Sequence, residues 1–224
     1  MKLKKILISL LLLLLTLGLI HAAPAQADSS TSQQVKAIQK RGVLNVGVKQ
    51  DVPNFGYLNP DSNTYSGLEI DIAKKIAKEL GVKINYVPVT AQTRGPLLDN
   101  GQVDMVIATF TITDERKEIY NFTTPYYTDA SGFLVNKSSK ITDVKDLNNK
   151  TIGVVQGSIT QTLLEEIAQE KKLNFKYVEL GSYPELAVSL RAHRIDAISV
   201  DKSTLTGYVS SKSNILEKKK KKAD

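Results

Sequence analysis

The sequence predicts an α/β fold with two lobes. Its 224 residues are 42% hydrophobic, which is enough to bury a sizeable core and too apolar for a disordered chain. Short apolar segments typical of buried strands alternate with amphipathic segments typical of helices. This alternation occurs twice, and residues 120–130 separate the two series. We therefore expect two α/β lobes joined by a crossover, with a cleft between them.

The first lobe is predicted over residues 28–125. Residues 43–48 have the composition of a buried strand, and the turn-rich residues 49–67 predict a loop that reaches toward a ligand. An amphipathic helix that ends at Gly81 follows. Its apolar face is set by the residues that recur every four positions: Leu68, Ile72, Ile76 and Leu80. Three more elements complete the lobe: a strand at 83–87, a helix near 96–100 and a strand at 103–108.

The second lobe is predicted over residues 126–210. Its elements are strands at 132–135, 152–155, 175–178 and 197–200 and helices at 159–171 and 184–192. Residues 202–211 predict a final helix, after which we expect no further strand. Residues 211–224 form a tail with five lysines at 218–222. Such a run is usually a solvated segment, and attraction to an anionic surface is the alternative.

The first 27 residues have the three parts of a secretory signal. Basic residues at 2–5 precede an apolar run at 6–20, and small residues lie before Asp28. We expect cleavage near Ala27, which leaves the mature chain periplasmic, secreted or at the cell surface. An uncleaved membrane anchor is the alternative, but the run is shorter than the roughly 20 residues that a spanning helix needs.

Composition excludes several classes of function. The net charge of +7 becomes −1 without the lysines at the two ends, so we expect no nucleic-acid partner. The chain has no Cys and two His, which excludes disulfides, thiol chemistry and anchoring through a lipidated Cys, and leaves little for a metal site. No glycine-rich phosphate loop is present. We expect neither a cofactor nor a metal.

The segment after the strand at 103–108 carries the first candidate binding residues. Open α/β sheets bind ligands beyond the carboxyl ends of their strands, where Thr109, Thr111 and Arg116 lie. A guanidinium can hold a carboxylate through two parallel hydrogen bonds, and the threonines offer hydroxyl and backbone groups. The alternative for Arg116 is an exposed arginine at a helix start, paired with Glu115 or Glu118.

Two further cations are candidates in the first lobe. Lys49 ends the first strand, and Arg94 lies just before a helix that begins with Pro96. Two cations at strand or loop ends on one rim bring positive charge to the expected cleft. The alternative for each is an ordinary exposed surface residue.

The second lobe adds candidates where its strands end. Ser158 and Ile159 begin a helix whose free N–H groups favour an anion, and a capping box from Ser158 to Gln161 is the alternative. Asp201 ends the strand at 197–200 and can face a cation across the cleft, or can cap the next helix. Tyr183 can close over a small ligand, although a core or hinge role is equally open.

Together these segments resemble the solute-binding proteins of polar amino-acid ABC importers, which have the type II periplasmic-binding fold. The resemblance covers about residues 43–209. The blocks that carry it lie at 46–53, 67–73, 93–98, 107–116, 120–122 and 196–203. Because of the Arg-Gly-Pro-Leu-Leu motif at 94–98, the chain is most similar to the branch that binds aspartate or glutamate.

Carried over residue by residue, the resemblance implies a site for the amino acid's α-carboxylate. Arg116 and Thr111 match the positions of its clamp, assisted by the helix start at Ser158 and Ile159. This clamp would serve every amino acid, because each carries the same α-carboxylate.

The resemblance also implies partners for the rest of the ligand. Asp201 matches the residue that receives the ammonium group, with Thr109 supplying a backbone carbonyl. Arg94 matches the position that receives a side-chain carboxylate, with Lys49 and Tyr183 as helpers.

Two departures from the family pattern are visible. Family members return from lobe two through a further strand and finish with helices on lobe one, whereas here a lysine run follows residues 213–216. We therefore expect a C-terminally truncated fold. The lipidated Cys is absent as well, which favours a free periplasmic or secreted protein.

The resemblance implies a monomer that binds glutamate or aspartate in the cleft and delivers it to an ABC permease, without performing a reaction. A glutamine-binding homologue is the nearest alternative. A same-fold enzyme, such as an amino-acid-precursor dehydratase, is another, and Glu69 and Glu115 are its only nearby acid or base candidates. A surface adhesion or sensor module that uses the lysine tail is a third.

Overall fold

The computed structural model describes residues 29–209 and 213–217. The chain divides into two compact units, Met1–Lys40 and Arg41–Asp224. Helix α2 spans Ser29–Arg41 and ends at the boundary between the two units. The expected signal segment and the five lysines lie outside the described residues, so both stay predictions. In the part of the chain that is described, no helix has the length and apolar composition needed to span a bilayer.

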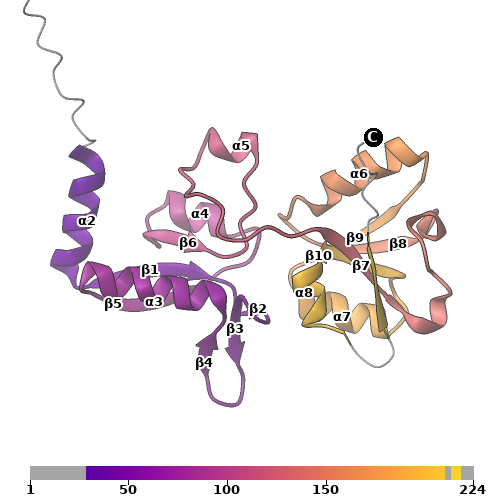
Figure 1. The fold of residues 1–224 in the computed structure, drawn as a ribbon, viewed down its shortest axis with the longest axis horizontal. Helices are drawn as coiled ribbons and strands as arrows, with labels where there is room; N and C mark the ends of the chain where they lie inside the picture. The colour runs from indigo at the N-terminus through magenta and orange to yellow at the C-terminus, as the bar shows by residue number, and fades with distance from the viewer. Residues whose placement is uncertain (1–28, 210–212, 218–224) are drawn as a thin grey trace, which may run out of the picture. The chain divides into compact units, whose positions relative to one another are not determined.

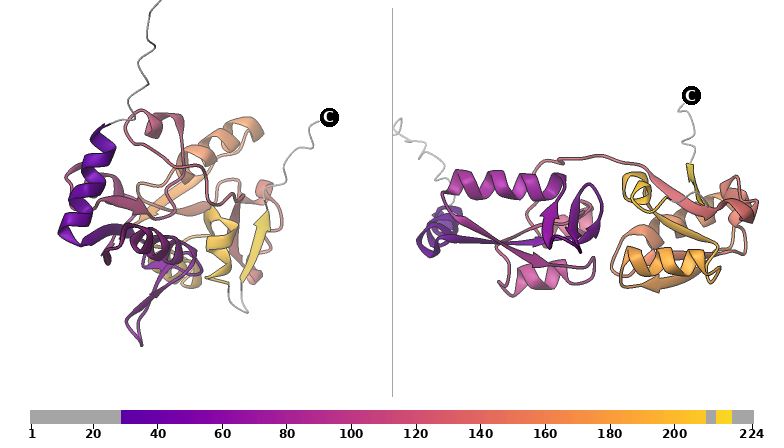
Figure 2. Two further views of the ribbon diagram at one scale, coloured as in Figure 1. Left: turned by 60° about the vertical axis from the view of Figure 1, so that its left-hand side comes forward. Right: turned by 90° about the horizontal axis from the view of Figure 1, so that it is seen from below.

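The first lobe contains a parallel three-stranded sheet in the order β5-β1-β6 (Figure 1). Its elements are β1 (Val43–Val48), α3 (Leu68–Leu80), β5 (Lys83–Pro88), α4 (Arg94–Asp99), β6 (Met105–Ile107) and α5 (Asp114–Lys117). Helices α3 and α4 cover opposite faces of this sheet, as the right-hand view of Figure 2 shows. The strand at 43–48 has the predicted bounds, and α3 ends at Gly81 as predicted, in a left-handed C-cap.

Two predictions for the first lobe are wrong. Residues 49–67 are not a plain loop, because they contain a small antiparallel sheet of β2 (Asp51–Val52), β3 (Gly56–Asn59) and β4 (Thr64–Ser66). The core face of α3 is also shifted. Its buried residues are Glu69, Ile70, Ala73 and Ala77, whereas Leu68 is exposed. The small alanines allow the helix to approach β1 and β5 closely on that side.

The second lobe contains a five-stranded mixed sheet in the order β11-β7-β10-β8-β9. Its elements are β7 (Ser131–Asn136), the short helices η1 (Lys137–Ser139) and η2 (Val144–Leu147), β8 (Thr151–Val155), α6 (Thr160–Lys171), β9 (Lys176–Leu180), α7 (Tyr183–Arg191), β10 (Ala197–Asp201), α8 (Lys202–Thr206) and β11 (Ser213–Glu217). Strands β8, β9 and β10 are parallel, while β7 runs antiparallel to both β10 and β11.

Two predictions for the C-terminal end of this lobe are wrong. Helix α8 spans only Lys202–Thr206 and not residues 202–211, and Gly207 is its C-cap. A further strand does follow, since β11 at Ser213–Glu217 pairs with β7 in antiparallel register. The expected tail at 211–224 therefore begins with an ordered strand of the sheet.

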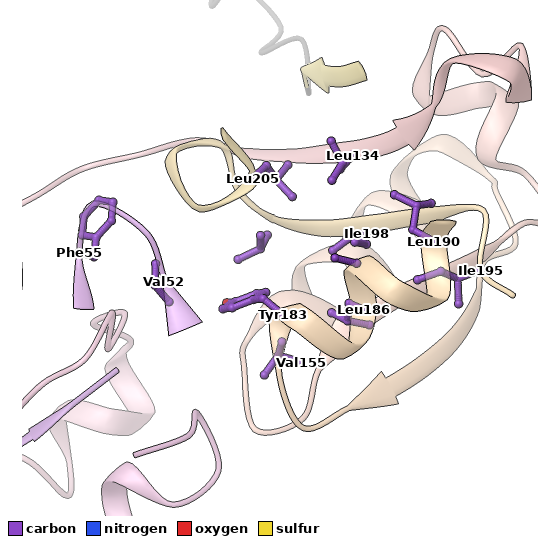
Figure 3. Packing of buried hydrophobic residues seen from close by; sticks show 12 residues of the cluster. Val52, Phe55, Leu134, Val155, Tyr183, Leu186, Leu190, Ile195, Ile198 and Leu205 are labelled. Carbon is purple, nitrogen blue, oxygen red and sulfur yellow. The ribbon is translucent and has the colours of Figure 1, made fainter. Parts of the chain in front are cut away.

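Two apolar clusters cover the two faces of the second-lobe sheet, as strand alternation requires. Phe133 and Val135 of β7 belong to a cluster with α6, whereas Leu134 between them belongs to a cluster with α7. Figure 3 shows the α7 cluster, which also contains Val52 and Phe55 of the first lobe. The segment around β2 is thereby packed against the second lobe.

Candidate functional site

The turn after β6 holds Thr109 in an unusual conformation. Its φ is +48°, in the left-handed region that a β-branched residue rarely adopts. Two buried charged groups hold the turn. The Thr109 N–H donates to Glu69 Oε1 at 2.5 Å, and the Thr109 carbonyl accepts from Arg94 Nη1 at 2.9 Å. The carbonyl that was predicted to receive a ligand ammonium thus already has one donor, which leaves its second lone pair available.

Arg94 is neither a surface residue nor placed before its helix. It is the first residue of α4 and is 3% exposed. Its Nη1 donates to the carbonyls of Ala108, at 2.7 Å, and Thr109, while its guanidinium carbon lies 4.1 Å from the centre of the Phe110 ring. Burial, followed by repulsion from Arg116, lowers the pKa of Arg94 to about 10.

Arg116 lies half-buried in α5 and contacts both lobes. Its Nη1 donates to the Thr111 carbonyl at 2.9 Å, and its Nη2 donates to the Gly157 carbonyl at 3.4 Å. The guanidinium carbon is 4.6 Å from the centre of the Phe110 ring. Among the described residues it forms no ion pair, so the alternative of pairing with Glu115 or Glu118 is not found. Burial lowers the pKa of Arg116.

Lys49 is also buried, with 2% exposure, and is paired with an acid. Its Nζ lies 2.9 Å from Asp51 Oδ1 and 5.7 Å from the centre of the Tyr183 ring. Asp51 also accepts from the backbone N–H of Tyr183 at 3.4 Å. The pKa of Tyr183 is raised, first by burial and then by the charge of Asp201. Lys49, Tyr183 and Asp201 therefore share one neighbourhood, in which Asp51 already balances the lysine charge.

The predicted capping box at the start of α6 is not formed. The N-cap position falls on Ile159, which offers no capping side chain, and Ser158 Oγ receives only a 3.4 Å bond from the Thr160 N–H. Gln161 donates to Glu165 instead of reaching back. The start of α6 therefore keeps N–H groups without a capping side chain, and it begins next to Gly157, which contacts Arg116.

Asp201 occupies the N-cap position of α8 without capping it. Asp129, from the crossover, does so in its place: it accepts from the Ser203 N–H at 2.8 Å and from the Ser203 hydroxyl. These bonds lower the pKa of Asp129, although burial opposes them. The pKa of Asp201 is raised, by burial first and by repulsion from Asp129 second. A buried acid with an unfavourable charge is suited to receive a cationic group.

A groove of about 640 Å³ lies along Phe55, Leu68, Tyr127 and Thr206, and its lining includes Asp129, Lys202 and Ser203 next to Asp201. None of the nine predicted site residues lines it. Six of those residues instead gather in two places. Arg94, Thr109, Thr111 and Arg116 surround Phe110, and Lys49 and Tyr183 lie beside Asp51. The charge of Arg94 also acts on the pKa of Tyr183, which places the two groups near each other.

Comparison with known proteins identifies the family. The sequence profile of the bacterial extracellular solute-binding proteins, family 3, matches residues 44–162. The chain belongs to this family. A glutamine-binding protein of Geobacillus stearothermophilus is 36% identical over 86% of this chain and 73% of its own length. A glutamate/aspartate import solute-binding protein of Salmonella typhimurium is 28% identical over 92% of this chain and 70% of its own length.

Solved structures of this family agree with the fold. An amino-acid ABC transporter substrate-binding protein of Streptococcus pneumoniae, bound to L-arginine, has a TM-score of 0.75 and 30% identity. The match covers 84% of this chain and 80% of that structure. The family 3 chain described here therefore has the predicted type II periplasmic-binding fold.

Sequence reasoning missed several residues that lie at this candidate site. Phe110 lies between the two arginines, and only its position between two threonines at a strand end marked it. Asp51 follows Lys49 by two residues, a spacing that brings opposite charges to the same side of an extended chain. Glu69 was considered only as an enzyme's acid or base without partners, whereas it is buried and hydrogen-bonded to two groups. Asp129 gave no local signal, because its partner Ser203 is far along the chain.

Proposed function

We propose that this protein binds an acidic amino acid, glutamate or aspartate, and delivers it to an ABC permease outside the cytoplasmic membrane. The observation that carries the proposal is the pair of guanidinium groups over Phe110. Arg94 and Arg116 lie 4.1 and 4.6 Å from the same ring centre, and each is at least half-buried. Beyond burial, the charge of Arg116 lowers the pKa of Arg94, so the two cations repel each other, and an anion beside them would offset that repulsion.

A dicarboxylate ligand supplies two such anions. In the proposed pose, Arg116 clamps the α-carboxylate, with the Thr111 segment and the uncapped start of α6 beside it. The side-chain carboxylate faces Arg94. Asp201 receives the ammonium group, which relieves the cost of its own buried charge.

Lys49 is expected to add less than its burial suggests. Its ammonium is already paired with Asp51 at 2.9 Å, so its net contribution to an anionic ligand is small. Arg94 has no such close acid: Glu69 acts on it electrostatically, yet no ion pair joins them among the described residues. Burial raises the pKa of Glu69, although its hydrogen bonds from Tyr126 and Thr109 and the charges of Arg94 and Lys49 oppose this.

Glutamine is the second candidate ligand, because the relative that is 36% identical is a glutamine-binding protein. A neutral amide would satisfy the hydrogen-bonding groups of the site but would leave the second guanidinium charge unbalanced. We further propose that no reaction takes place. Glu69, the main candidate for an enzyme's acid or base, has no exposed surface, and one of its oxygens accepts from Tyr126 and Thr109.

Calorimetric titration with glutamate, aspartate, glutamine and arginine tests the proposal. We expect an acidic ligand to bind about 10- to 100-fold more tightly than glutamine, the difference of one or two charge-assisted bonds. Mass spectrometry of the ligand after prolonged incubation should show no product. Tighter binding of glutamine would assign the second candidate, and binding of none of the four would remove the proposal.

A further inference from the structure

Glu69 is a fully buried carboxyl group that the proposed ligand contacts do not use. It lies in the first turn of α3, on the face toward the sheet, and has no exposed surface. One of its oxygens, Oε2, has no hydrogen-bond partner among the described residues. Burying a carboxyl group costs free energy, which its hydrogen bonds offset only in part. We therefore expect this carboxyl group to make hydrogen bonds that an apolar residue could not make.

Its other oxygen joins two segments that are far apart in the sequence. Oε1 accepts from the Thr109 N–H at 2.5 Å and from the Tyr126 hydroxyl at 2.6 Å. Thr109 follows β6 in the first lobe, whereas Tyr126 lies in the segment that leads into β7 of the second lobe. A single oxygen atom therefore ties the ligand-site turn and the crossover to the start of α3.

The Thr109 turn needs such support. A β-branched residue at φ +48° is unfavourable, and it persists only when its surroundings fix it. The Thr109 N–H donates to Glu69 and the Thr109 carbonyl accepts from Arg94, so hydrogen bonds fix both peptide groups of the strained residue. The turn leads directly into Phe110, whose ring contacts both arginines, and Thr111, whose carbonyl accepts from Arg116.

We propose that Glu69 is a positioning residue for amino-acid binding. It fixes the Thr109 turn in its left-handed conformation and joins that turn to the crossover through Tyr126. Phe110, Thr111 and Arg116 therefore already occupy their binding positions in the ligand-free protein. The inference rests on the proposed function and adds to it that Glu69, which does not contact the ligand, sets the affinity for the amino acid. Preorganisation of this kind raises affinity because less ordering remains to be done on binding.

Three variants test the inference. Glu69→Met keeps the length of the side chain and removes both hydrogen bonds. Glu69→Gln keeps a carbonyl oxygen that can accept both bonds and removes the charge, so it serves as the conservative rescue. Tyr126→Phe removes only the link to the crossover. Asp71→Asn, an exposed acid on the same helix, controls for charge, and Ile70→Val controls for a small loss of core packing.

The readouts are glutamate affinity by calorimetry and the Thr109 amide proton shift by NMR in the ligand-free protein. We expect Glu69→Met to weaken binding about tenfold or more and Tyr126→Phe to weaken it about three- to tenfold, as loss of a bond to a charged group predicts. The glutamate affinity of Glu69→Gln should stay within about threefold of that of the parent protein. The Thr109 amide shift should move upfield in the Met variant and be largely kept in the Gln variant. The two control variants should change neither readout.

Two outcomes would overturn the inference. One is unchanged affinity and Thr109 shift in Glu69→Met. The other is an equal loss in the Met and Gln variants, which would mean that charge acts and not position. If the Met variant does not fold, unchanged binding in Tyr126→Phe overturns the proposed link. If the parent protein binds no amino acid, the proposed function fails, while the Thr109 shift of the ligand-free variants still decides whether Glu69 holds the turn.

Discussion

The guanidinium groups of Arg94 and Arg116 share the ring of Phe110, at 4.1 and 4.6 Å from its centre. The aromatic ring attracts both cations, yet after burial the charge of Arg116 lowers the pKa of Arg94 further. The two arginines differ in what holds them. Arg94 is anchored to the carbonyls of Ala108 and Thr109, whereas Arg116 is half-buried and bridges to the second lobe at Gly157. Their replacement should therefore have different consequences.

Arg116→Ala should abolish measurable binding of every amino acid while leaving the protein folded. The proposed clamp of the α-carboxylate is common to all ligands, and a charge-assisted bidentate pair is the strongest contact available to it. Arg191→Ala, which removes an exposed arginine from α7, is the matched control and should bind normally. Calorimetry and circular dichroism measure the two effects; micromolar binding by Arg116→Ala would refute the clamp.

Arg94→Gln should shift preference from glutamate toward glutamine. The buried ligand carboxylate loses its counter-charge, whereas the amide loses only a donor that the new side chain partly replaces. We expect the glutamate-to-glutamine affinity ratio to fall about tenfold, measured by competition titration. Because Arg94 also donates to two buried carbonyls, the variant should lose about 1–3 kcal/mol of unfolding free energy. An unchanged ratio would mean that Arg94 serves only the fold.

Asp201→Asn should stabilise the ligand-free protein at pH 7 and weaken ligand binding. Burial raises the pKa of Asp201 in the folded chain, so its charged form opposes folding at neutral pH. The gain in melting temperature should shrink as the pH falls through this raised pKa and vanish below about pH 4, where the unfolded residue is protonated too. Binding should weaken because the ligand ammonium loses its anionic partner. A variant less stable than the parent at pH 7 would contradict this reading of Asp201.

Gly157→Ala should destabilise the protein by about 1–3 kcal/mol, which denaturant unfolding measures. Gly157 has φ +77°, and a Cβ there would lie 2.6 Å from the Cα of Gln92. Gly101→Ala isolates the cost of the backbone conformation, since Gly101 has φ +74° and no atom within 4 Å of an added Cβ. The difference in unfolding free energy between the two variants measures the effect of the close approach of Gly157 to Gln92. Equal losses of unfolding free energy would show that this approach contributes nothing.

Continuous apolar strands were predictable from the sequence, and segments fixed by long-range contacts were not. Residues 43–48 form β1 at the predicted bounds, because a buried parallel strand is apolar on both faces. Strands β2 to β4 were missed, since they are short and rich in turn residues and are held by backbone pairing. The site shows the same division. The candidate cations follow from strand and loop ends, but the burial of Arg94 depends on residues elsewhere in the chain, such as Ala108 and Thr109.

The place of β11 in the sheet has a consequence for the order of folding. Strand β7 pairs with β10 on one side and with β11 on the other, although α6, α7 and α8 all lie between β7 and β11 in the sequence. During synthesis the N-terminal part of the second lobe is exposed to solvent first, and β7 keeps an unpaired edge until Ser213–Glu217 emerges. Pairings that close such long loops form slowly. The sheet of the second lobe is therefore completed only when Ser213–Glu217 has been synthesised, later than any other strand pairing among the described residues.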